Sequence, residues 1–543
     1  MTTTRDDDAR LVVQAVAAYT EAALAAAGRQ TGGGERIDDH QVVVERVASA
    51  ATDARVARSL AAALDAHPGA DDSFRAPATA ALADLARSAR ERLEPVADAL
   101  GLPEVAYDGA TRAAIARLGA EEVVRAIGRE VAAARGKNPW PLEPTLSEVR
   151  QSVRQFADRV IAPGAEHLHR HDELVADTVI AQMAELGYFG LSVPEAFGGH
   201  ELGNLAMVLT TEELSRASLA GAGSLITRPE ILAKALLAGG TEAQKATWLP
   251  KLAAGERMVA ISVTEPNVGS DVAAVACRAI AATVDGVAGY RIDGAKAWCT
   301  FAGRADVIAV LARTDPDPTK GAKGLSLFIV EKPRFDGHEF VATQPSGGRL
   351  TGKADRTPGY RGMHSFTLAF DDWFVPATHL VGEAAGLGRG FYLQMAGFAA
   401  GRLQTGGRAC GLAQAAVERT AEYVVARGQF GRPIIEYGLT QHQLGRMACR
   451  LAAARAITYE AAVAMDGDER AAAPLAAQAK LFACDAAVEI TQLGQVLHGG
   501  WGYAEEYPIS RYVVDALVLP IFEGVRPILA LKVVGRALLA GRG

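Results

Sequence analysis

Cysteine is scarce in this sequence, and no two cysteines form a C-x-x-C pair. The cysteines are odd in number and widely spaced, at Cys277, Cys299, Cys410, Cys449 and Cys484. Disulfide frameworks and zinc sites need paired or closely spaced cysteines, so the sequence indicates neither. We expect these residues to be small buried hydrophobic side chains in a reducing compartment.

The chain also lacks an excess of positive charge. Its formal net charge is -7 at pH 7, which leaves no basic surface of the kind that binds nucleic acid or an anionic membrane. Residues 1–28 start with acidic side chains and contain no uninterrupted apolar span, so we expect neither a secretory signal nor a membrane helix there. A cytoplasmic location is expected, and a small anionic ligand would need local arginines.

A dinucleotide-binding motif is absent as well. No G-x-G-x-x-G follows a predicted strand, and the predicted helices and strands are segregated along the chain. A doubly wound α/β sheet would alternate them. A nucleotide cofactor, if bound, should therefore not lie in a Rossmann site.

The composition is that of a globular protein with several domains. Of its 543 residues, 49% are hydrophobic and 22% are charged. Residues 1–137 are rich in Ala, Arg and Asp, and their aliphatic residues recur at helical spacing, which predicts a separate helical extension. The segment Gly136–Thr145 contains three prolines and a glycine and predicts a linker.

Three further regions follow the linker. Residues 145–257 have helical periodicity, with Thr145 or Ser147 as the expected N-cap. Residues 258–382 consist of short β-branched or aromatic segments separated by Gly, Pro, Asp and Asn, which predicts a small sheet domain. Helical periodicity returns over residues 386–541. The predicted fold class is α+β, with a sheet domain between helical domains and an extra helical domain at the N-terminus.

One carboxylate stands out near the C-terminus. Leu517–Pro527, LVLPIFEGVRP, places Glu523 at the end of an apolar run and directly before Gly524. Burial of an ionised carboxylate is unfavourable unless a partner or a raised pKa relieves it, so such a residue is either turned to water or kept for chemistry. On this stretch alone, a loop glutamate turned to water is the simpler interpretation.

Two stretches of the predicted sheet domain offer groups to a ligand. Thr264–Asp271, TEPNVGSD, follows a strand and has backbone N–H groups, hydroxyls and a predicted tight turn at Gly269. It suits a flat heterocycle or a phosphate, and also an ordinary hydrophilic turn. Lys296–Phe301, KAWCTF, places Trp298 and Thr300 on one strand face, although half-buried strand residues show the same pattern.

Together, several motifs resemble the acyl-CoA dehydrogenase family in order and spacing, over about residues 145–541. They are VTEPNVGSD (Val263–Asp271), the W-C-T strand (Trp298–Thr300), ARGQFGRPI (Ala426–Ile434), HGGWGYAEEYP (His498–Pro508) and IFEG (Ile521–Gly524). The resemblance implies a helical domain, a middle β domain and a C-terminal four-helix domain that hold FAD between them, in a homodimer or homotetramer. It also implies an acyl-CoA substrate, an electron-transfer flavoprotein as electron acceptor, and no metal, nucleic acid or membrane partner.

The same resemblance implies roles for individual residues. Glu523 would be the base that removes the α proton of an acyl-CoA, because a carboxylate in a water-poor pocket is a better match for a carbon acid. Some family members carry the base just before the arginine that here is Arg402, but this sequence has Gly401 there, which leaves Glu523. FAD contacts are implied for Val263, Thr264, Gly269, Ser270, Trp298, Thr300, Arg427, Phe430, Gln495 and Gly499, and substrate contacts for Ser270, Arg402, Gly524 and Arg228.

Within the implied FAD site, Trp298 would lie against the isoalloxazine and Thr300 near the nitrogen that accepts hydride. Arg427 and Phe430 would contact the pyrophosphate and adenine side across a subunit boundary, with guanidinium-to-phosphate pairing as the physical reason.

Two positions depart from the family pattern. Val496 replaces the usual FAD-contacting glutamine, with Gln495 one residue early, and Val525 followed by Arg526-Pro527 replaces the usual threonine after Glu-Gly. These departures concern the adenosine side of FAD and leave the reacting centre untouched.

The substrate is expected to be a short branched dicarboxylic acyl-CoA. The extension, Ser224–Lys245 and Pro358–Val375 are most similar to a family member that oxidises (2S)-methylsuccinyl-CoA to mesaconyl-CoA. A substrate carboxylate needs a cation, and Arg228 lies on the segment that forms the floor of the acyl pocket in the family; a surface arginine capped by Pro229 is an equal alternative. Another short-chain or glutaryl-type acyl-CoA remains an alternative, as does a DNA-binding relative, which the mixed C-terminal charges disfavour.

Overall fold

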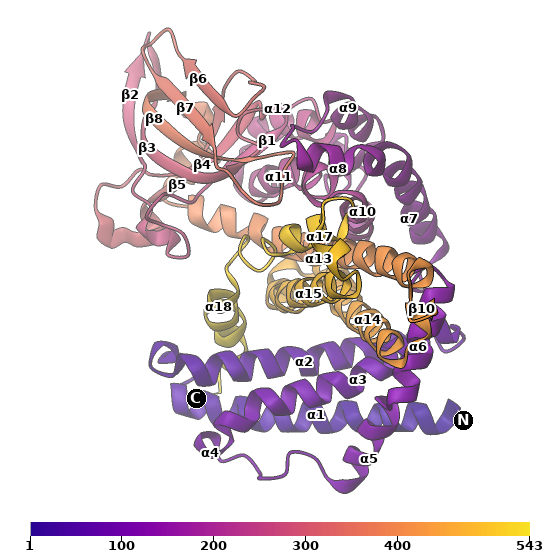
Figure 1. Ribbon diagram of the computed structural model, residues 1–543. Helices are drawn as coiled ribbons and strands as arrows, with labels where there is room; N and C mark the ends of the chain where they lie inside the picture. The colour runs from indigo at the N-terminus through magenta and orange to yellow at the C-terminus, as the bar shows by residue number, and fades with distance from the viewer. Residues whose placement is uncertain (1, 543) are drawn as a thin grey trace. The chain divides into compact units, whose positions relative to one another are not determined.

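The computed structural model describes residues 2–542, which divide into two compact units. Of the described residues, unit 1 consists of 2–149 and 405–542, and unit 2 consists of 150–404. The boundary near residue 404 falls inside the long helix α13 (Gly390–Ala426). The predicted α+β fold class is confirmed, with a mixed sheet inserted between helical regions (Figure 1).

The N-terminal extension is helical, and it belongs to the same compact unit as the C-terminal helices instead of forming a separate one. Figure 1 shows α1, α2 and α3 as long helices lying side by side. The side chains of Asp71 and Asp108 cap α3 and α5 by accepting hydrogen bonds from backbone N–H groups of the first turn. The helices are α1 (Thr2–Thr31), α2 (Gln41–Ala66), α3 (Asp72–Leu93), α4 (Ala97–Leu100), α5 (Gly109–Leu118) and α6 (Glu121–Ala133).

Helix α1 is long and apolar, although no membrane helix is expected from the acidic start of the chain. By length and composition alone, Thr4–Thr31 meets the requirement for a membrane-spanning helix. The helix packs against α2, α3 and α5 and buries Val12, Val16 and Ala23 completely. A buried core helix and a signal sequence near the N-terminus meet the same requirement, and just under half of the apolar window is buried here.

The C-terminal helices complete unit 1. They bury a shared apolar cluster with the extension, formed by Ala48 of α2 and by Ala477, Leu481, Leu529, Ala530 and Val534. The short strands β9 (Gly428–Gln429) and β10 (Arg432–Pro433) form a hairpin after α13. The helices are α14 (Gly438–Gly467), α15 (Glu469–Leu497), α16 (Gly500–Tyr503), α17 (Ile509–Ala516), α18 (Arg526–Ile528), the π-helix η12 (Leu529–Gly535) and α19 (Arg536–Leu539).

Helices α6 and α14 cross closely at two glycines. A Cβ atom at Gly128 would lie 1.8 Å from the carbonyl oxygen of Gln441, and one at Gly445 would lie 2.0 Å from that of Val124. No real Cβ atom approaches a backbone oxygen so closely, so only glycine permits this crossing. The extension is therefore fitted to the C-terminal helices and is not merely attached to them.

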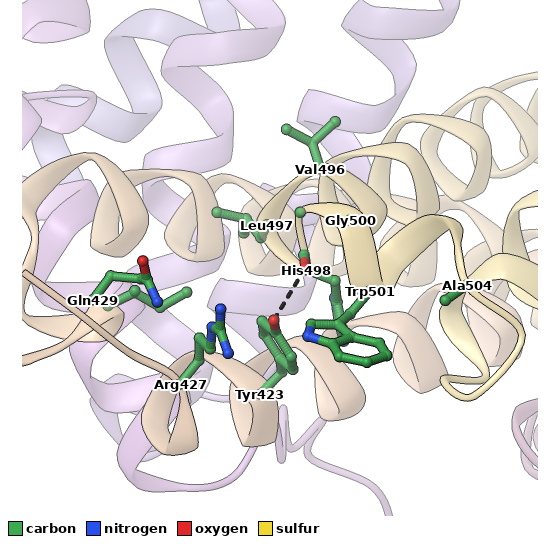
Figure 2. A pocket seen from close by; sticks show the side chains of 11 residues that line it. Tyr423, Arg427, Gln429, Val496, Leu497, His498, Gly500, Trp501 and Ala504 are labelled. Atoms are coloured by element: carbon green, nitrogen blue, oxygen red, sulfur yellow. Dashed lines mark hydrogen bonds between the residues drawn. The ribbon is translucent and has the colours of Figure 1, made fainter.

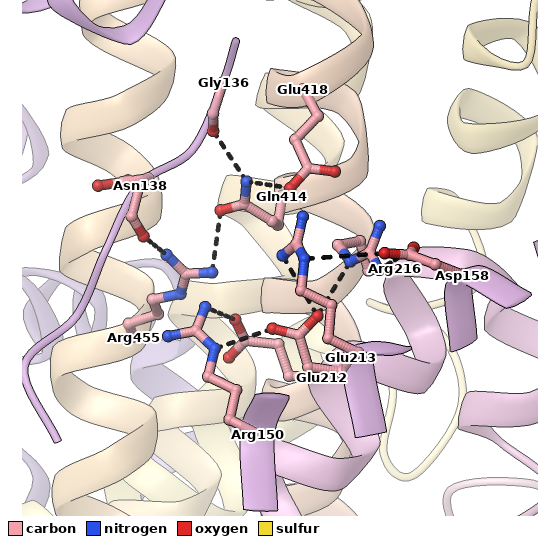
Figure 3. A network of polar contacts seen from close by, with 11 residues as sticks. Gly136, Asn138, Arg150, Asp158, Glu212, Glu213, Arg216, Gln414, Glu418 and Arg455 are labelled. Carbon is pink, nitrogen blue, oxygen red and sulfur yellow. Dashed lines mark hydrogen bonds and ion pairs between the residues drawn. The ribbon is translucent and has the colours of Figure 1, made fainter. Parts of the chain in front are cut away.

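The predicted linker has no regular structure, but it is held in place. Arg455 donates to the carbonyl oxygen of Asn138 at 2.7 Å, and Gln414 donates to that of Gly136 at 2.9 Å (Figure 3). Trp140 packs edge-on against Phe74 and Tyr459. The predicted N-cap is wrong, because the next helix, α7 (Pro144–Phe156), already begins at the proline whose fixed φ suits a first helical position.

Unit 2 contains helices and one mixed sheet. The strand order is β1-β4-β2-β3-β8-β7-β6, with β5 paired to β4, and all ladders are antiparallel except β1 with β4 and β2 with β4. The helices are α8 (Ala162–Arg170), α9 (Asp177–Glu185), α10 (Gly203–Ala217), α11 (Thr227–Gly239) and α12 (Glu242–Ala253), and the strands are β1 (Val259–Ser262), β2 (Arg278–Val284), β3 (Val287–Thr300), β4 (Val307–Arg313), β5 (Leu325–Glu331), β6 (Glu339–Thr343), β7 (Arg349–Ala354) and β8 (Ser365–Pro376).

The core of unit 2 lies between its helices and its sheet. Leu232 and Leu236 of α11 and Leu249 of α12 pack against Val307 of β4 and Ile329 of β5, and all five side chains are almost completely buried. This packing fixes α11 and its N-terminal turn against the sheet.

The cysteines are free and buried, as predicted. Burial raises the pKa of Cys277 to about 11 and that of Cys299 to about 12. These thiols therefore stay protonated at neutral pH and act as small hydrophobic residues.

Candidate active site

Glu523 lies in the turn between α17 and α18 of unit 1. Its φ angle is +54° and that of Gly524 is +104°, a conformation that a non-glycine residue adopts only when its surroundings hold it. The backbone N–H of Arg526 closes the turn by donating to the carbonyl oxygen of Pro520 at 2.8 Å. Glu523 is half-buried and its Oε2 atom is shielded from solvent. The interpretation of Glu523 as a loop glutamate turned to water therefore does not fit the structure.

Two buried cations support this turn. Lys480 of α15 donates from Nζ to the carbonyl oxygen of Gly524 at 2.7 Å. Arg408 of α13 lies over the ring of Phe522, 4.8 Å from its centroid, in a cation–π contact. Sequence reasoning missed both residues, although a lysine inside the apolar stretch of α15 was an available signal.

In unit 2, a buried ion pair anchors the loop that follows β1. Lys296 of β3 donates to Glu265 Oε1 at 2.9 Å and to the carbonyl oxygen of Val263 at 3.0 Å. The same carboxylate accepts backbone hydrogen bonds from Ala276 and Cys277 at 2.9 Å and 2.8 Å. One paired and hydrogen-bonded carboxylate therefore joins both ends of this loop to the strand.

The tight turn predicted at Gly269 is wrong. Glu265 and Val268 exchange backbone hydrogen bonds of 2.8 Å and 3.1 Å, so the turn closes one step earlier. Gly269 is absent from the left-handed region, and a Cβ atom there would meet nothing within 4 Å. Thr264 is half-buried, while Gly269 and Ser270 are exposed, so the loop presents backbone and hydroxyl groups to the exterior of the unit.

Trp298 and Thr300 form an exposed aromatic plane beside a hydroxyl. Trp298 has a φ of +58°, and the pairing of β3 with β8 shifts between Lys296 and Cys299, so the strand carries a bulge here. The indole is 59% exposed. Thr300 is half-buried, with Oγ1 2.9 Å from Ser365 Oγ. A large exposed indole on a bulged strand suits a flat partner.

Arg228 lies in the first turn of α11 and is only 6% exposed. Its guanidinium donates to the carbonyl oxygen of Ser224 at 3.3 Å and to Thr227 Oγ1 at 3.1 Å. Among residues 150–404, no carboxylate forms an ion pair with it. Its charge opposes the rise in pKa that burial gives Cys299, which places the guanidinium near β3. The surface alternative for Arg228 is wrong, and a buried cation without a carboxylate partner in its unit invites an anionic ligand.

A cleft of about 590 Å³ lies within unit 1. Figure 2 shows Arg427, Tyr423 and Trp501 around it. The hydroxyl of Tyr423 donates to the carbonyl oxygen of His498 at 3.0 Å, and the two rings stack at 4.2 Å. Burial lowers the pKa of His498, so the ring is neutral at neutral pH. Sequence reasoning missed Tyr423, His498 and Trp501 as residues of this cleft.

The structure brings some predicted FAD contacts together and not others. Arg427 and Gly499 line the cleft, and Gly499 has a φ of +61°. Phe430 is 94% exposed at the tip of the β9–β10 hairpin, outside this cleft. Gln495 is also outside it and donates to the carbonyl oxygen of Gly502 at 3.1 Å. Arg402 lies on α13 in unit 2 and is half-buried.

Asp172, His338 and His364 form the group most similar to a metal site among the described residues. Their ligand atoms lie within 4.8 Å of one another. Asp172 is already engaged, because His364 Nε2 lies 3.1 Å and Arg361 Nε 3.3 Å from its Oδ1 atom. Burial lowers the pKa of His364, although Asp172 opposes this. We interpret the group as an ion-pair network.

These features suit a flavin. The exposed indole of Trp298 and the hydroxyl of Thr300 fit the edge and face of an isoalloxazine, and Arg427 beside the left-handed Gly499 fits a phosphate. A half-buried carboxylate on a strained turn adds a base. Each unit thus contributes groups of the kind that a flavin-dependent oxidoreductase needs.

Comparison with known families identifies the family to which the chain belongs. Models of the acyl-CoA dehydrogenase N-terminal, middle and C-terminal domains match residues 143–256, 260–373 and 388–539. The chain belongs to the acyl-CoA dehydrogenase family, whose members use FAD. The family, the cofactor and the enzyme class predicted from the motifs are thereby confirmed.

Several relatives are similar over most of their length. The chain is 41% identical over 399 residues to (2S)-methylsuccinyl-CoA dehydrogenase of Cereibacter sphaeroides, covering 73% of this chain and 70% of the relative. The structure of butyryl-CoA dehydrogenase from Megasphaera elsdenii matches with a TM-score of 0.66 and 30% identity, covering 74% and 100%. A chain in the structure of the electron transferring flavoprotein of Acidaminococcus fermentans matches with a TM-score of 0.66 and 30% identity, covering 74% and 99%. Other relatives are named for 2-methylacyl-CoA and isovaleryl-CoA, so membership alone does not specify the substrate.

Proposed function

We propose that the protein oxidises a short branched dicarboxylic acyl-CoA, (2S)-methylsuccinyl-CoA, to mesaconyl-CoA, a step of the ethylmalonyl-CoA pathway. The observation that carries this proposal is Arg228, a buried guanidinium with no carboxylate partner in its unit. A free carboxylate on the acyl chain would supply the missing anion. The similarity to methylsuccinyl-CoA dehydrogenase supports the same substrate.

In this proposal Glu523 removes the α proton of the acyl-CoA. The left-handed turn and the bonds to its backbone hold the carboxylate, and partial burial limits competition from water. FAD, when bound, would supply the acceptor for the hydride of the β carbon, and loss of the α proton to Glu523 together with this hydride would leave a double bond between the α and β carbons. Trp298 presents its ring to the flavin, and Ser365 orients the hydroxyl of Thr300.

The remaining contacts follow the family pattern. Val263, Thr264, Gly269 and Ser270 would lie along the flavin and the pantetheine arm, and Arg427 with Gly499 would bind the pyrophosphate. Ser270, Arg402 and Gly524 would contact the substrate. We further propose a homodimer or homotetramer in the cytoplasm, with electron-transfer flavoprotein as the electron acceptor. The similarity to the chain in the electron transferring flavoprotein structure supports this acceptor.

Purified protein assayed with a panel of acyl-CoAs and an artificial electron acceptor tests the proposed substrate. We expect kcat/KM for (2S)-methylsuccinyl-CoA to exceed that for butyryl-CoA by at least about tenfold, since only the dicarboxylate pairs with a buried cation. Glutaryl-CoA is included because it also carries a distal carboxylate. A preference for glutaryl-CoA would replace the proposed substrate, and a preference for butyryl-CoA would reject the dicarboxylate class.

Replacing Thr300 with Ala should slow flavin reduction by about tenfold, while acyl-CoA binding changes little. A hydroxyl beside the hydride-accepting nitrogen stabilises charge only as the flavin becomes reduced. Rapid-mixing absorbance measurements over a range of substrate concentrations separate the two effects. Thr300→Ser keeps the hydroxyl and should retain most of the rate. An effect confined to the apparent dissociation constant would show instead that the hydroxyl is a simple binding contact.

A further inference from the structure

Arg526 lies three positions after Glu523 and joins three parts of unit 1. Its backbone N–H closes the Glu523 turn at Pro520. Its Nε atom donates to both carboxylate oxygens of Asp485 on α15, at 2.8 Å and 3.1 Å. Its Nη1 atom donates to Glu45 Oε1 on α2 at 2.9 Å. One residue therefore links the turn to a C-terminal helix and to the N-terminal extension.

The contact with Glu45 is the first of several between the extension and the chain that follows the turn. Lys532 pairs with Asp38, and Arg542 pairs with Glu21. Ala48, one helical turn after Glu45, packs in an apolar cluster with Leu529, Ala530, Val534, Ala477 and Leu481. The extension thus contacts the chain that follows Glu523, from Arg526 at the start of α18 onward.

This arrangement also accounts for a departure in the sequence. In this chain, Val525 followed by Arg526-Pro527 replaces the threonine that usually follows Glu-Gly in the family. The catalytic role of Glu523 does not explain this replacement. In the structure, Pro527 lies at the start of α18, where its fixed φ suits a first turn, and Arg526 reaches Glu45. The departure therefore coincides with the contact to the extension.

We propose that Glu45 and Arg526 are positioning residues for Glu523, and that the N-terminal extension braces the turn that carries the base. This inference rests on the proposed role of Glu523. A left-handed glutamate relaxes unless the chain on both sides is held. Lys480 holds the carbonyl group of Gly524. The ion pairs of Arg526 with Glu45 and with Asp485 hold the chain two residues further on. Because proton abstraction depends steeply on orientation, a looser turn lowers the rate without removing the base.

The test compares two variants of the full-length FAD enzyme. Glu45→Gln removes the charge that binds Arg526, and Arg55→Met breaks the pair of Arg55 with Glu460, another contact between the extension and a C-terminal helix. Both pairs are similarly buried, with side chains 29% and 30% exposed in the first and 31% and 34% in the second. Only the first pair adjoins the turn of Glu523.

We expect Glu45→Gln to lower kcat for methylsuccinyl-CoA about tenfold, with KM and FAD content changed less than about twofold. The kinetic isotope effect with α-deuterated substrate should rise, since proton abstraction becomes more limiting. Arg55→Met should lower Tm and leave kcat and the isotope effect unchanged. In Arg526→Gln, the further change Glu45→Gln should add almost nothing, because the interaction is already lost.

If Glu45→Gln lowered Tm alone, as Arg55→Met is expected to do, the extension would only stabilise the fold and the proposal would be wrong. Arg526→Lys provides a second variant, since it keeps the charge but cannot serve both carboxylates, and should show an intermediate loss of kcat. A failure of the proposed base is separately visible, because Glu523→Gln would then stay active whatever Glu45→Gln does.

Discussion

Replacing Glu523 with Gln should lower the turnover of acyl-CoA by roughly 10²–10⁴-fold while FAD stays bound. The amide keeps the size of the side chain and its ability to accept a hydrogen bond, but it cannot take the α proton. Flavin absorbance measured after rapid mixing with methylsuccinyl-CoA reports the rate of reduction. The ratio of flavin to protein absorbance reports cofactor content.

Two control variants distinguish loss of the base from a general effect of removing a carboxylate. Glu489→Gln changes another partly buried carboxylate of unit 1, one that pairs with Arg446 and Arg450 on α14, and it should keep nearly full turnover. Glu523→Asp keeps a base but withdraws it by one methylene, and should fall between the wild type and Glu523→Gln. Near wild-type turnover in Glu523→Gln would show that another group removes the proton.

Local sequence patterns predict much of the fold, and the misses have physical causes. Strands rich in β-branched and aromatic residues, such as β4, β5 and β8, are evident from the sequence. Strands β2, β6 and β7 are less evident from the sequence. In β2, RAIAATV has little intrinsic strand preference, and β7, RLTGKA, contains a glycine. Strand β2 pairs with β3, β7 pairs with β8, and β6 pairs in turn with β7, and local sequence does not reveal these pairings.

In the candidate site too, some residues can be predicted from local sequence and others cannot. Glu523, Trp298 and Thr300 lie in recognisable motifs, so the sequence predicts them. The groups that hold them are distant in sequence: Lys296 is 31 residues from Glu265, Lys480 is 44 from Gly524, and Arg526 is 481 from Glu45. Each pair forms only when the fold brings separate elements together. The turn predicted at Gly269 lies instead at Glu265–Val268, and Lys296 of β3, which is distant in sequence, holds Glu265 in place.

Replacing Arg228 with Met should lower kcat/KM for methylsuccinyl-CoA by on the order of a hundredfold, and lower activity on butyryl-CoA far less or even raise it. Arg228 is buried, and its guanidinium bonds only to Ser224 and Thr227 within its unit. With Met in its place, a substrate carboxylate would enter a site that has no cation. An uncharged acyl chain would instead gain an apolar neighbour. The measurement is kcat/KM on both substrates with the same electron acceptor.

Arg216→Met is the matched control for Arg228→Met, because Arg216 is also a buried arginine of unit 2 but pairs with Glu213 and Asp158. Its loss removes one of the three arginines that pair with the buried Glu213, beside Arg150 and Arg154, and should weaken the fold and both activities alike. Arg228→Lys should retain part of the preference, since it keeps the charge but loses the planar fork that matches a carboxylate. Equal losses on both substrates in Arg228→Met would mean that Arg228 is structural. The cation for the substrate carboxylate would then have to come from another element, and the arginine-rich N-terminal extension would be the first place to search.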